Sequence, residues 1–384
     1  MKYFIIAGEA SGDLHAGNLV KALKQEDDQA QFRGLGGDLM QEQGVELVQH
    51  YRDMAYMGFI DVALHLRTIL RIKRRAQEEI LAFAPDVVIL VDYPSFNLRV
   101  AEFVKKEMPG TKVYYYIAPK VWAWKSWRVK SLRKYVDRVF SILPFEIEWF
   151  GQRGCEVSYI GNPCVDAVES RAHKGEDFAT FSERVGLDSA KPVLALLPGS
   201  RVGELKSNLP TMLEAASKFT EYQMVVAAAP SIEDALYDEL CKGYEVKRVL
   251  GETYQLLQQA RAAVVTSGTA TLETALMRTP QVVVYYVGGG KVVHWLLTRL
   301  IKVKDVSLVN LIARKKVVKE LLCHFMTAEN VEAELHNILP DTPIRQQMLA
   351  DYDALIELLG HEPVSQRAAK EMVMRLREKP ESLL

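Results

Sequence analysis

Residues 193–197 form a short apolar run, and Pro198, Gly199, Ser200 and Arg201 follow it directly. Such a run is typical of a strand buried inside a parallel sheet. A Gly-Ser turn that leads from a strand into a helix leaves backbone N–H groups free to bind an anion. The Arg201 guanidinium adds forked donors that suit phosphate. This segment therefore predicts both a parallel α/β fold and a phosphate site.

A second segment of the same kind follows a strand predicted at residues 262–266. The turn after that strand consists of Ser267, Gly268, Thr269 and Ala270, and Glu273 follows one helical turn later. Gly and Ser are also ordinary residues of strand–helix turns, so either segment alone also fits a plain connection. Two such turns with a nearby carboxylate favour a pocket for a nucleoside diphosphate, with Glu273 suited to a ribose hydroxyl.

The composition is that of a folded globular chain. It has 384 residues, of which 49% are apolar and 25% charged, and this length suits two domains. The formal net charge is −1, so no overall field attracts nucleic acid, and we expect no nucleic-acid partner. The four cysteines form no C-x-x-C pair, and the eight histidines have no H-E-x-x-H spacing. We therefore expect a cytoplasmic protein without a metal or other cofactor.

Strand-like and helix-like segments alternate along the chain, which predicts parallel sheets with right-handed crossovers. The expected strands are residues 3–7, 31–35, 87–91, 112–117, 138–143, 156–160, 193–197, 223–228, 247–250, 262–266 and 281–286. We predict an α/β fold of two Rossmann-like, doubly wound domains that face each other across a cleft. A polar interruption at about 161–191 places these domains at 1–165 and 190–342. The helical segment 343–384 is expected to pack back on the first domain.

Several motifs occur in an order that resembles one known family. They are residues 8–13 (GEASGD), 92–97 (DYPSFN), 121–124 (VWAW), 143–146 (LPFE), 197–201 (LPGSR) and 267–273 (SGTATLE). Together they closely resemble the lipid-A-disaccharide synthases, which are bacterial glycosyltransferases. The resemblance implies a two-domain enzyme of the glycosyltransferase B type, inverting and metal-independent. It implies transfer from UDP-2,3-diacylglucosamine to 2,3-diacylglucosamine 1-phosphate, giving the β-1,6-linked disaccharide 1-phosphate and UDP.

Asp92 is the candidate general base, because it follows a strand and faces the expected cleft. The alternative is that Asp92 only caps the next helix. Arg201 is expected to stabilise the departing UDP. The residues expected to bind the nucleotide are Gly199, Ser200, Arg201, Ser267, Gly268, Thr269, Ala270, Glu273, Asn310 and Glu320. The residues expected on the acceptor side are Glu9, Ser11, Gly12, Asp13 and His15, whose segment also fits a plain tight turn. The chain departs from the family pattern at Ser95, Val309 and Cys323.

An apolar stripe with flanking cations lies at residues 57–75 and suits a helix on anionic lipid. The residues expected to make this contact are Ile60, Leu66, Arg67, Ile69, Leu70, Arg71, Arg74 and Arg75. A core helix with a solvated basic end is the alternative, and residues 294–304 are a second candidate contact. No apolar run approaches the roughly 18–20 residues that span a bilayer. We therefore expect peripheral attachment to the cytoplasmic side of the inner membrane, with a homodimer left open.

Two other functions fit parts of the pattern. A UDP-N-acetylglucosamine epimerase would share the phosphate turns but gives no reason for a basic amphipathic surface. A non-enzymatic lipid-binding protein regulated by nucleotide would bind UDP but release none from an acylated donor. The release of UDP from acylated substrates separates all three readings.

Overall fold

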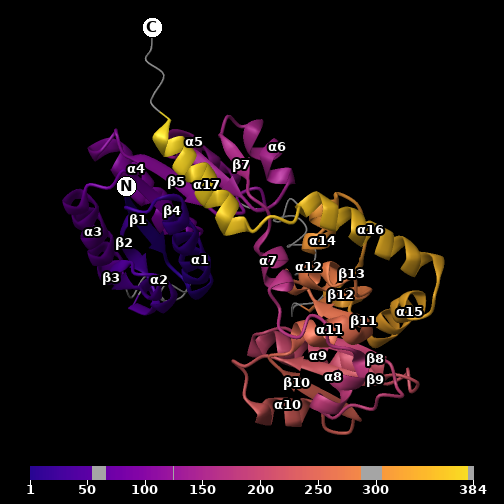
Figure 1. Ribbon diagram of the computed structural model, residues 1–384. Helices are drawn as coiled ribbons and strands as arrows, with labels where there is room; N and C mark the ends of the chain where they lie inside the picture. Colours follow the sequence, from indigo (N-terminus) through magenta and orange to yellow (C-terminus); the bar gives the residue numbers. More distant parts are fainter. Residues whose placement is uncertain (54–65, 124, 287–304, 379–384) are drawn as a thin grey trace. The chain divides into compact units, whose positions relative to one another are not determined.

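The computed structural model describes residues 1–53, 66–123, 125–286 and 305–378 (Figure 1). The chain divides into two compact units. Unit 1 contains Met1–Pro163 and His361–Leu384, and unit 2 contains Cys164–Gly360. Each unit is built around one all-parallel sheet, which confirms the predicted α/β class with two doubly wound sheets.

The sheet of unit 1 has the strand order β3-β2-β1-β4-β5-β6-β7. Its strands are β1 (Lys2–Ala7), β2 (Gln31–Gly36), β3 (Glu46–His50), β4 (Val87–Val91), β5 (Lys112–Tyr116), β6 (Arg138–Ser141) and β7 (Val157–Tyr159). The helices of this unit are α1 (Ala10–Glu26), α2 (Asp38–Glu42), α3 (Leu66–Phe83), α4 (Pro94–Glu107), α5 (Val129–Tyr135), α6 (Phe145–Gly151) and α17 (Val364–Arg377), with short 3₁₀ turns η1 (Tyr51–Asp53) and η2 (Ser126–Arg128).

The apolar runs of this sheet serve two cores at once. Along β4, Val87, Ile89 and Val91 pack in one core, while Val88 and Leu90 pack in the core on the other face. Successive side chains of a strand point to opposite faces, and helices cover both faces of a parallel sheet. This is why the central strands read as continuous hydrophobic runs. Helices α1 and α17 supply the first core, and α3 and α4 supply the second.

The sheet of unit 2 has the strand order β10-β9-β8-β11-β12-β13. Its strands are β8 (Val193–Leu197), β9 (Gln223–Ala228), β10 (Val246–Leu250), β11 (Ala260–Thr266), β12 (Gln281–Tyr285) and β13 (Lys319–Leu322). The helices of this unit are α7 (Pro163–Glu169), α8 (Phe178–Val185), α9 (Val202–Ala216), α10 (Asp234–Leu240), α11 (Thr253–Gln259), α12 (Thr269–Leu276), α14 (Leu308–Ala313), α15 (Ala328–Ile338) and α16 (Pro343–Leu359), with the 3₁₀ turn η3 (Cys323–Phe325).

The strand order reverses once in each sheet, between β1 and β4 in unit 1 and between β8 and β11 in unit 2. At such a point the two connections leave toward opposite faces of the sheet, and a crevice opens at the carboxyl ends of the strands. The GEASGD and DYPSFN motifs follow β1 and β4, and the LPGSR and SGTATLE motifs follow β8 and β11. Four of the motifs thus meet the two crevices.

The C-terminal helices divide between the units, which corrects the expectation that residues 343–384 pack together on the first domain. Helix α16 stays in unit 2, where it contacts α12, α14 and α15. Its Tyr352 is fully buried and its hydroxyl accepts a hydrogen bond from Gln281 Nε2 at 3.2 Å. Only α17 packs on unit 1, beside α1 (Figure 1). The chain changes units at Gly360, whose φ of +78° ends α16.

Two strands, β3 and β13, were not expected from the sequence. Both lie at sheet edges, and their side chains are mostly half-buried. They therefore lack the continuous apolar run that marks the central strands.

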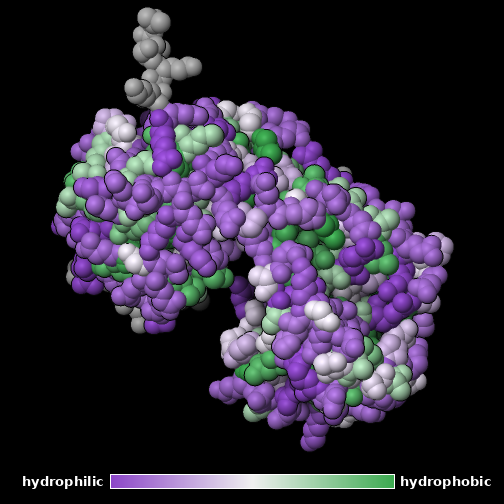
Figure 2. All heavy atoms as spheres, viewed as in Figure 1, coloured by the Kyte–Doolittle hydropathy of each residue, from purple (hydrophilic) through white to green (hydrophobic). Residues whose placement is uncertain are grey.

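No helix in the described ranges combines the length and the apolar character that crossing a bilayer requires. The face of the molecule in Figure 2 is mainly hydrophilic and carries scattered hydrophobic spots.

The packing of α17 predicts how two methionines of that helix differ. Met372 is fully buried against α1, whereas Met374 is 51% exposed. We expect Met372→Ala to lower the free energy of unfolding by about 2–5 kcal/mol, because it leaves a cavity in the core. Met374→Ala is the matched control and should change it by less than about 0.5 kcal/mol. Urea unfolding followed by tryptophan fluorescence measures both, and equal effects would contradict this packing.

Candidate functional site

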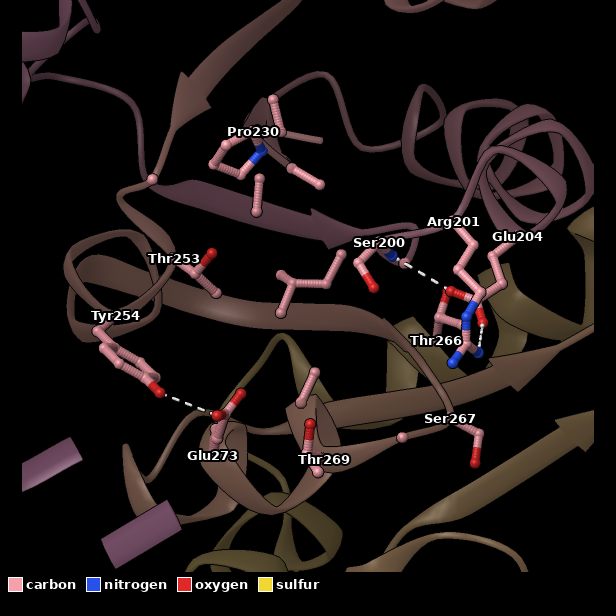
Figure 3. Close-up of a pocket in the computed structure, with 18 residues that line it drawn as sticks. Ser200, Arg201, Glu204, Pro230, Thr253, Tyr254, Thr266, Ser267, Thr269 and Glu273 are labelled. Atoms are coloured by element: carbon pink, nitrogen blue, oxygen red, sulfur yellow. Dashed lines mark hydrogen bonds and ion pairs between the residues drawn. The ribbon is translucent and has the colours of Figure 1, made fainter. Parts of the chain in front are cut away.

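A cavity of about 610 Å³ lies in unit 2 at the carboxyl ends of four neighbouring strands (Figure 3). Its walls come from the turns after β8, β9, β10 and β11 and from the first residues of α9, α11 and α12. The polar side chains that line it belong to Ser200, Arg201, Glu204, Thr253, Tyr254, Thr266, Ser267, Thr269 and Glu273. Eight of the ten residues expected to bind the nucleotide line this cavity, all except Asn310 and Glu320.

The turn after β8 requires its glycine. Gly199 has a φ of +105°, and a Cβ at this position would lie 2.5 Å from Glu204 Oε2. Such a conformation is open to glycine at little cost. The Glu204 carboxylate therefore folds back over the turn and accepts the Ser200 N–H at 3.2 Å. This arrangement resembles a capping box, because Glu204 lies in the first turn of α9.

Glu204 also orients Arg201. Nη1 of Arg201 donates to Glu204 Oε1 at 3.0 Å, while the Arg201 side chain is 82% exposed. A guanidinium has five N–H donors, so this ion pair leaves most of them for a ligand. The first turn of α9 adds the positive end of its helix dipole. Together these groups provide the positive charge and the N–H donors that suit an anion.

The start of α12 provides a second set of donors on the cavity wall. Gly268 is the N-cap residue of this helix, and Thr269 and Ala270 begin it, all three at the cavity wall. The N–H groups of a first helical turn have no partner within the helix and attract anions. Asn208 from α9 holds this end of the sheet in place, because its Nδ2 donates to Thr266 Oγ1 at 3.0 Å and its Oδ1 accepts the Tyr286 N–H at 3.1 Å.

Glu273 lies across the cavity from Arg201 and pairs with Tyr254 (Figure 3). The Tyr254 hydroxyl donates to Glu273 Oε1 at 2.9 Å. Burial raises the pKa of Glu273, and the hydrogen bond from Tyr254 offsets part of that rise. Burial and the neighbouring carboxylate raise the pKa of Tyr254, so this hydroxyl remains a donor. The pair offers a ligand hydroxyl one fixed carboxylate.

Sequence reasoning missed the lining residues contributed by β9 and β10. Residues 227–230 are the last two residues of β9 and the two that follow it, and Gly251, Thr253 and Tyr254 follow β10. Both strands had been expected, and residues after parallel strands meet at one edge of the sheet. This rule could have predicted these positions from the sequence, although most of their side chains are not of the kinds that bind ligands or catalyse reactions.

Asn310 and Glu320 are not among the residues that line this cavity. Asn310 is 1% exposed, and its side-chain amide is hydrogen-bonded to Val317, Val318 and Glu320. The Glu320 carboxylate accepts the backbone N–H groups of Val306 and Ser307 at 3.0 and 2.9 Å. These bonds tie the start of α14 to β13. Their observed role is to hold local structure.

In unit 1, three residues with positive φ lie where β4 and β5 end. They are Asp92 (φ 43°), Tyr93 (φ 48°) and Ile117 (φ 64°). Positive φ costs a non-glycine residue about 1–3 kcal/mol, and such residues gather at functional sites. The Asp92 carbonyl is held by Asn97 Nδ2 at 2.7 Å and by the Tyr115 hydroxyl at 2.5 Å. The surrounding structure therefore enforces an unusual backbone that presents the Asp92 side chain.

The Asp92 carboxyl has a perturbed affinity for protons. Its pKa is raised, chiefly because neighbouring protein removes part of its hydration, and the negative charge of Glu9 raises it further. The positive charge of Lys120 acts in the opposite direction. The side chain nevertheless remains open to solvent. A hydrated carboxylate with a raised pKa at a strand end has the properties of a general base.

Tyr93 packs closely on the turn after β1. A Cβ on Gly8 would lie 2.6 Å from Tyr93 Cδ1, so the glycine makes room for this ring. Burial and the charge of Glu9 raise the pKa of Tyr93 to about 12. The first turn and the DYPSFN turn are therefore one packed unit, as expected for the switch point of this sheet.

Similarity to known proteins decides the family of this chain. The lipid-A-disaccharide synthetase family model matches residues 3–374. A lipid-A-disaccharide synthase from Myxococcus xanthus is 40% identical over 380 residues, covering 97% of each chain. One from Syntrophus aciditrophicus is 39% identical over 373 residues, covering 95% of each.

The chain belongs to the lipid-A-disaccharide synthase family. Its fold is also similar to solved enzymes with much lower sequence identity. UDP-GlcNAc 2-epimerase from Neisseria meningitidis, bound to UDP-GlcNAc, has a TM-score of 0.64 at 11% identity over 98% of this chain and 99% of its own. MnaA from S. aureus, solved with UDP, has a TM-score of 0.67 at 12% identity over 99% and 98%. These likenesses concern the fold alone.

The five residues expected on the acceptor side differ in how far they are buried and in what they bind. Glu9 is the exposed N-cap residue of α1, and Ser11 is exposed. Burial lowers the pKa of His15, which favours its neutral form. Asp13 is 2% exposed, and its carboxylate accepts the N–H groups of residues 37, 39 and 40. Asp13 therefore anchors α2 to α1, and Gly12 is buried beside Ala7.

Helix α3 carries part of the segment expected to contact lipid. Its Ile72, Ala76 and Ile80 pack in the core of unit 1. Leu70 is 49% exposed, and Arg71, Arg74 and Arg75 are exposed as well. The described part of the stripe thus has one core face and one basic surface with an apolar residue.

Some expectations lie outside the described residues. They concern Ile60 and the segment 294–304, as well as the side chains of Leu66, Arg67 and Ile69. Within the described ranges, no cluster of three or more His, Cys, Asp or Glu side chains has an arrangement that would hold a metal ion.

Proposed function

We propose that this chain transfers the diacylglucosaminyl group of UDP-2,3-diacylglucosamine to the 6-hydroxyl of 2,3-diacylglucosamine 1-phosphate. The family membership supports formation of a lipid A disaccharide. The observation that carries the site assignment is the cavity at the β8/β11 reversal, where two helix starts, Arg201 and Glu273 converge.

In this proposal UDP occupies the cavity of unit 2. The diphosphate takes the N–H groups at the starts of α9 and α12 together with the free donors of Arg201. The Glu273 carboxylate, fixed by Tyr254 at 2.9 Å, accepts the ribose hydroxyls. Glu204 keeps Arg201 at the mouth of the turn, since it binds one edge of the guanidinium at 3.0 Å. Arg201 and the dipoles of α9 and α12 supply the positive charge that stabilises the departing UDP.

The proposed transfer forms one bond, breaks one bond and moves one proton. The acceptor's 6-oxygen attacks the anomeric carbon of the donor sugar and forms the β-1,6 bond. The bond between that carbon and the β-phosphate oxygen breaks, and UDP leaves with the electron pair. The hydroxyl proton passes to Asp92, whose raised pKa makes it a stronger base than an ordinary aspartate. Attack from the side opposite UDP inverts the anomeric centre.

Arg201→Ala tests the phosphate site. We expect turnover to fall by about 10²–10³, because removing one preorganised charge contact costs this much in comparable sites. The melting temperature should not change, since the side chain is 82% exposed. Lys206→Ala is the matched control on the same helix, because Lys206 is exposed and outside the cavity lining. UDP release from both acylated substrates measures the rate, and near-normal turnover in the Arg201 variant would refute this role.

Asp92→Asn tests the base. The amide cannot accept the hydroxyl proton, so disaccharide formation should fall by about 10²–10⁴ while UDP affinity is unchanged. Asp28→Asn, an exposed aspartate in the same unit, is the control.

The pH profile gives a second readout of this role. The wild-type rate should fall as the pH drops and Asp92 takes up a proton. Because the pKa of Asp92 is raised, the midpoint should lie above that of an ordinary aspartate. A variant that keeps more than about a tenth of the normal rate would show that Asp92 only shapes the turn.

We also propose that residues 57–75 attach the protein to the cytoplasmic surface of the inner membrane. Both substrates carry acyl chains, whose removal from a bilayer costs about 0.8 kcal/mol per CH₂. The exposed Leu70 with Arg71, Arg74 and Arg75 supports this contact, because an apolar side chain among cations suits an anionic lipid surface.

Flotation with liposomes of phosphatidylglycerol and phosphatidylethanolamine tests the contact. Leu70→Ser combined with Arg71→Gln and Arg74→Gln should release the protein, and raised salt should weaken wild-type attachment. Leu81→Ser is the control, because Leu81 is 48% exposed near the other end of α3. If both variants float like the wild type, residues 57–75 are not the contact, and 294–304 becomes the candidate.

A further inference from the structure

A buried carboxyl group in unit 1 has no role in the mechanism above. Glu146, in the first turn of α6, is fully buried. Its Oε1 accepts the Trp122 indole N–H at 2.7 Å, and its Oε2 lies 2.5 Å from Ser141 Oγ. The LPFE and VWAW motifs, more than twenty residues apart in sequence, are thus joined by one carboxyl group. A buried carboxyl without full hydrogen bonding is costly, so its partners show which protonation state the site accepts.

The hydrogen bonds around Glu146 can be formed by both the protonated and the ionised carboxyl group. Ser141 Oγ accepts the Leu143 N–H at 3.1 Å and faces both Leu143 O at 2.9 Å and Glu146 Oε2. A hydroxyl has one proton to give, so it cannot donate to both oxygens. A protonated Glu146 donates to Ser141, which then donates to Leu143 O. An ionised Glu146 accepts a hydrogen bond from the Ser141 hydroxyl, and Leu143 O still accepts the Glu146 N–H at 3.0 Å.

Nearly all hydrogen-bonding groups around Glu146 have a partner in either protonation state, so neither state carries a large energetic penalty. Burial raises the pKa of Glu146 to about 7, while Ser141, Trp122 and the charge of Lys120 oppose that rise. Lys120 is the charged group that acts most strongly on this carboxyl. Its positive charge also lowers the pKa of Asp92, where Glu9 and burial act in the opposite direction. The turn that carries Lys120 leaves the end of β5, where Tyr116 O accepts the Asp92 N–H at 3.2 Å. The charge of Lys120 therefore acts on both carboxyl groups.

The chain between Trp122 and Lys120 is a tight turn. The Ala123 N–H donates to Lys120 O at 3.2 Å, and the Val121 N–H donates to Pro119 O at 2.6 Å. The turn leaves β5 through Ile117, which has a φ of +64°, and the Ala118 N–H binds Phe140 O on β6 at 3.0 Å. Trp122 also packs edge-on against Phe145 at 5.0 Å between ring centroids. The Glu146 bond to the indole thus fixes the free end of this turn.

We infer that Glu146 is a positioning residue for the acceptor half: its carboxyl holds Trp122, and through the 119–123 turn it keeps Lys120 beside Asp92. The inference rests on the proposed role of Asp92 as the base. The charge of Lys120 then tunes the basicity of Asp92. Glu146 touches no substrate and acts through Trp122 and Lys120.

The first test needs no activity. In protein labelled with ¹⁵N at the tryptophan indoles, the Trp122 N–H resonance should move with pH, with a midpoint at about 7. Trp122→Phe assigns that resonance. Glu146→Gln should abolish the movement, because its amide oxygen still accepts the indole N–H but no longer titrates. Glu148→Gln is the control, since Glu148 is exposed on the same helix. A resonance that does not titrate in the wild type overturns the inference.

The second test measures acceptor kinetics against pH. Glu146→Leu should lower kcat/KM for the acceptor by about ten- to a hundredfold, the cost of a small misplacement near the chemistry. It should also move the acidic limb upward, because Asp92 loses the positioned charge of Lys120, while UDP affinity stays unchanged. Glu146→Gln should restore most of the rate. Trp122→Phe should reproduce the leucine variant, and it replaces that variant if the latter does not fold.

The outcomes separate this inference from the proposed function. If the wild type forms no disaccharide from the two acylated substrates, the proposed function fails, and the indole titration still decides whether Glu146 holds Trp122. If the wild type is active but Glu146→Leu and Trp122→Phe leave the acidic limb in place, Glu146 does not position Lys120.

Discussion

Everything that this chain offers to a ligand depends on the burial of its two parallel sheets. Helices cover both faces of each sheet, so central strands such as β4 and β8 are apolar along their whole length. Chemistry is then confined to the strand ends. The reversals of strand order at β1/β4 and β8/β11 open space there, and polar side chains of four motifs lie at those two places.

The strand ends of the two units differ in electrostatic character, and this difference matches the separate roles proposed for them. In unit 2, two helix starts and the exposed Arg201 create a positive site, with the Glu273–Tyr254 pair opposite. In unit 1, the raised pKa values of Asp92 and Glu146 mark a site where burial favours protonated carboxyl groups. A nucleoside diphosphate suits the first environment, and proton transfer from a hydroxyl suits the second.

The turns at the strand ends of both units are also held in place by side chains to which no ligand contact is assigned. Asn208 joins Thr266 to residue 286, Glu204 braces the turn at Gly199, and Asn97 holds the carbonyl of Asp92. Such groups keep unusual backbone conformations in place, which a flexible turn would not do. Asn310, Glu320 and Asp13 belong to this class too, since their side chains are spent on backbone N–H groups. Polar residues in motifs therefore divide between ligand sites and their supports.

The sequence by itself determined the central strands, the two sheets, the two Gly-Ser turns and the family. Continuous apolar runs and Gly-Ser turns are local signals, and the chain order of the motifs carries the resemblance. Only the tertiary structure decided that α16 and α17 belong to different units, that β3 and β13 are edge strands, and that Tyr254 meets Glu273. The same holds for Glu146 and Trp122, because a hydrogen bond between residues twenty-four positions apart leaves no periodic trace in the sequence. Packing partners and protonation depend on which surfaces are buried together, and only the folded chain fixes that.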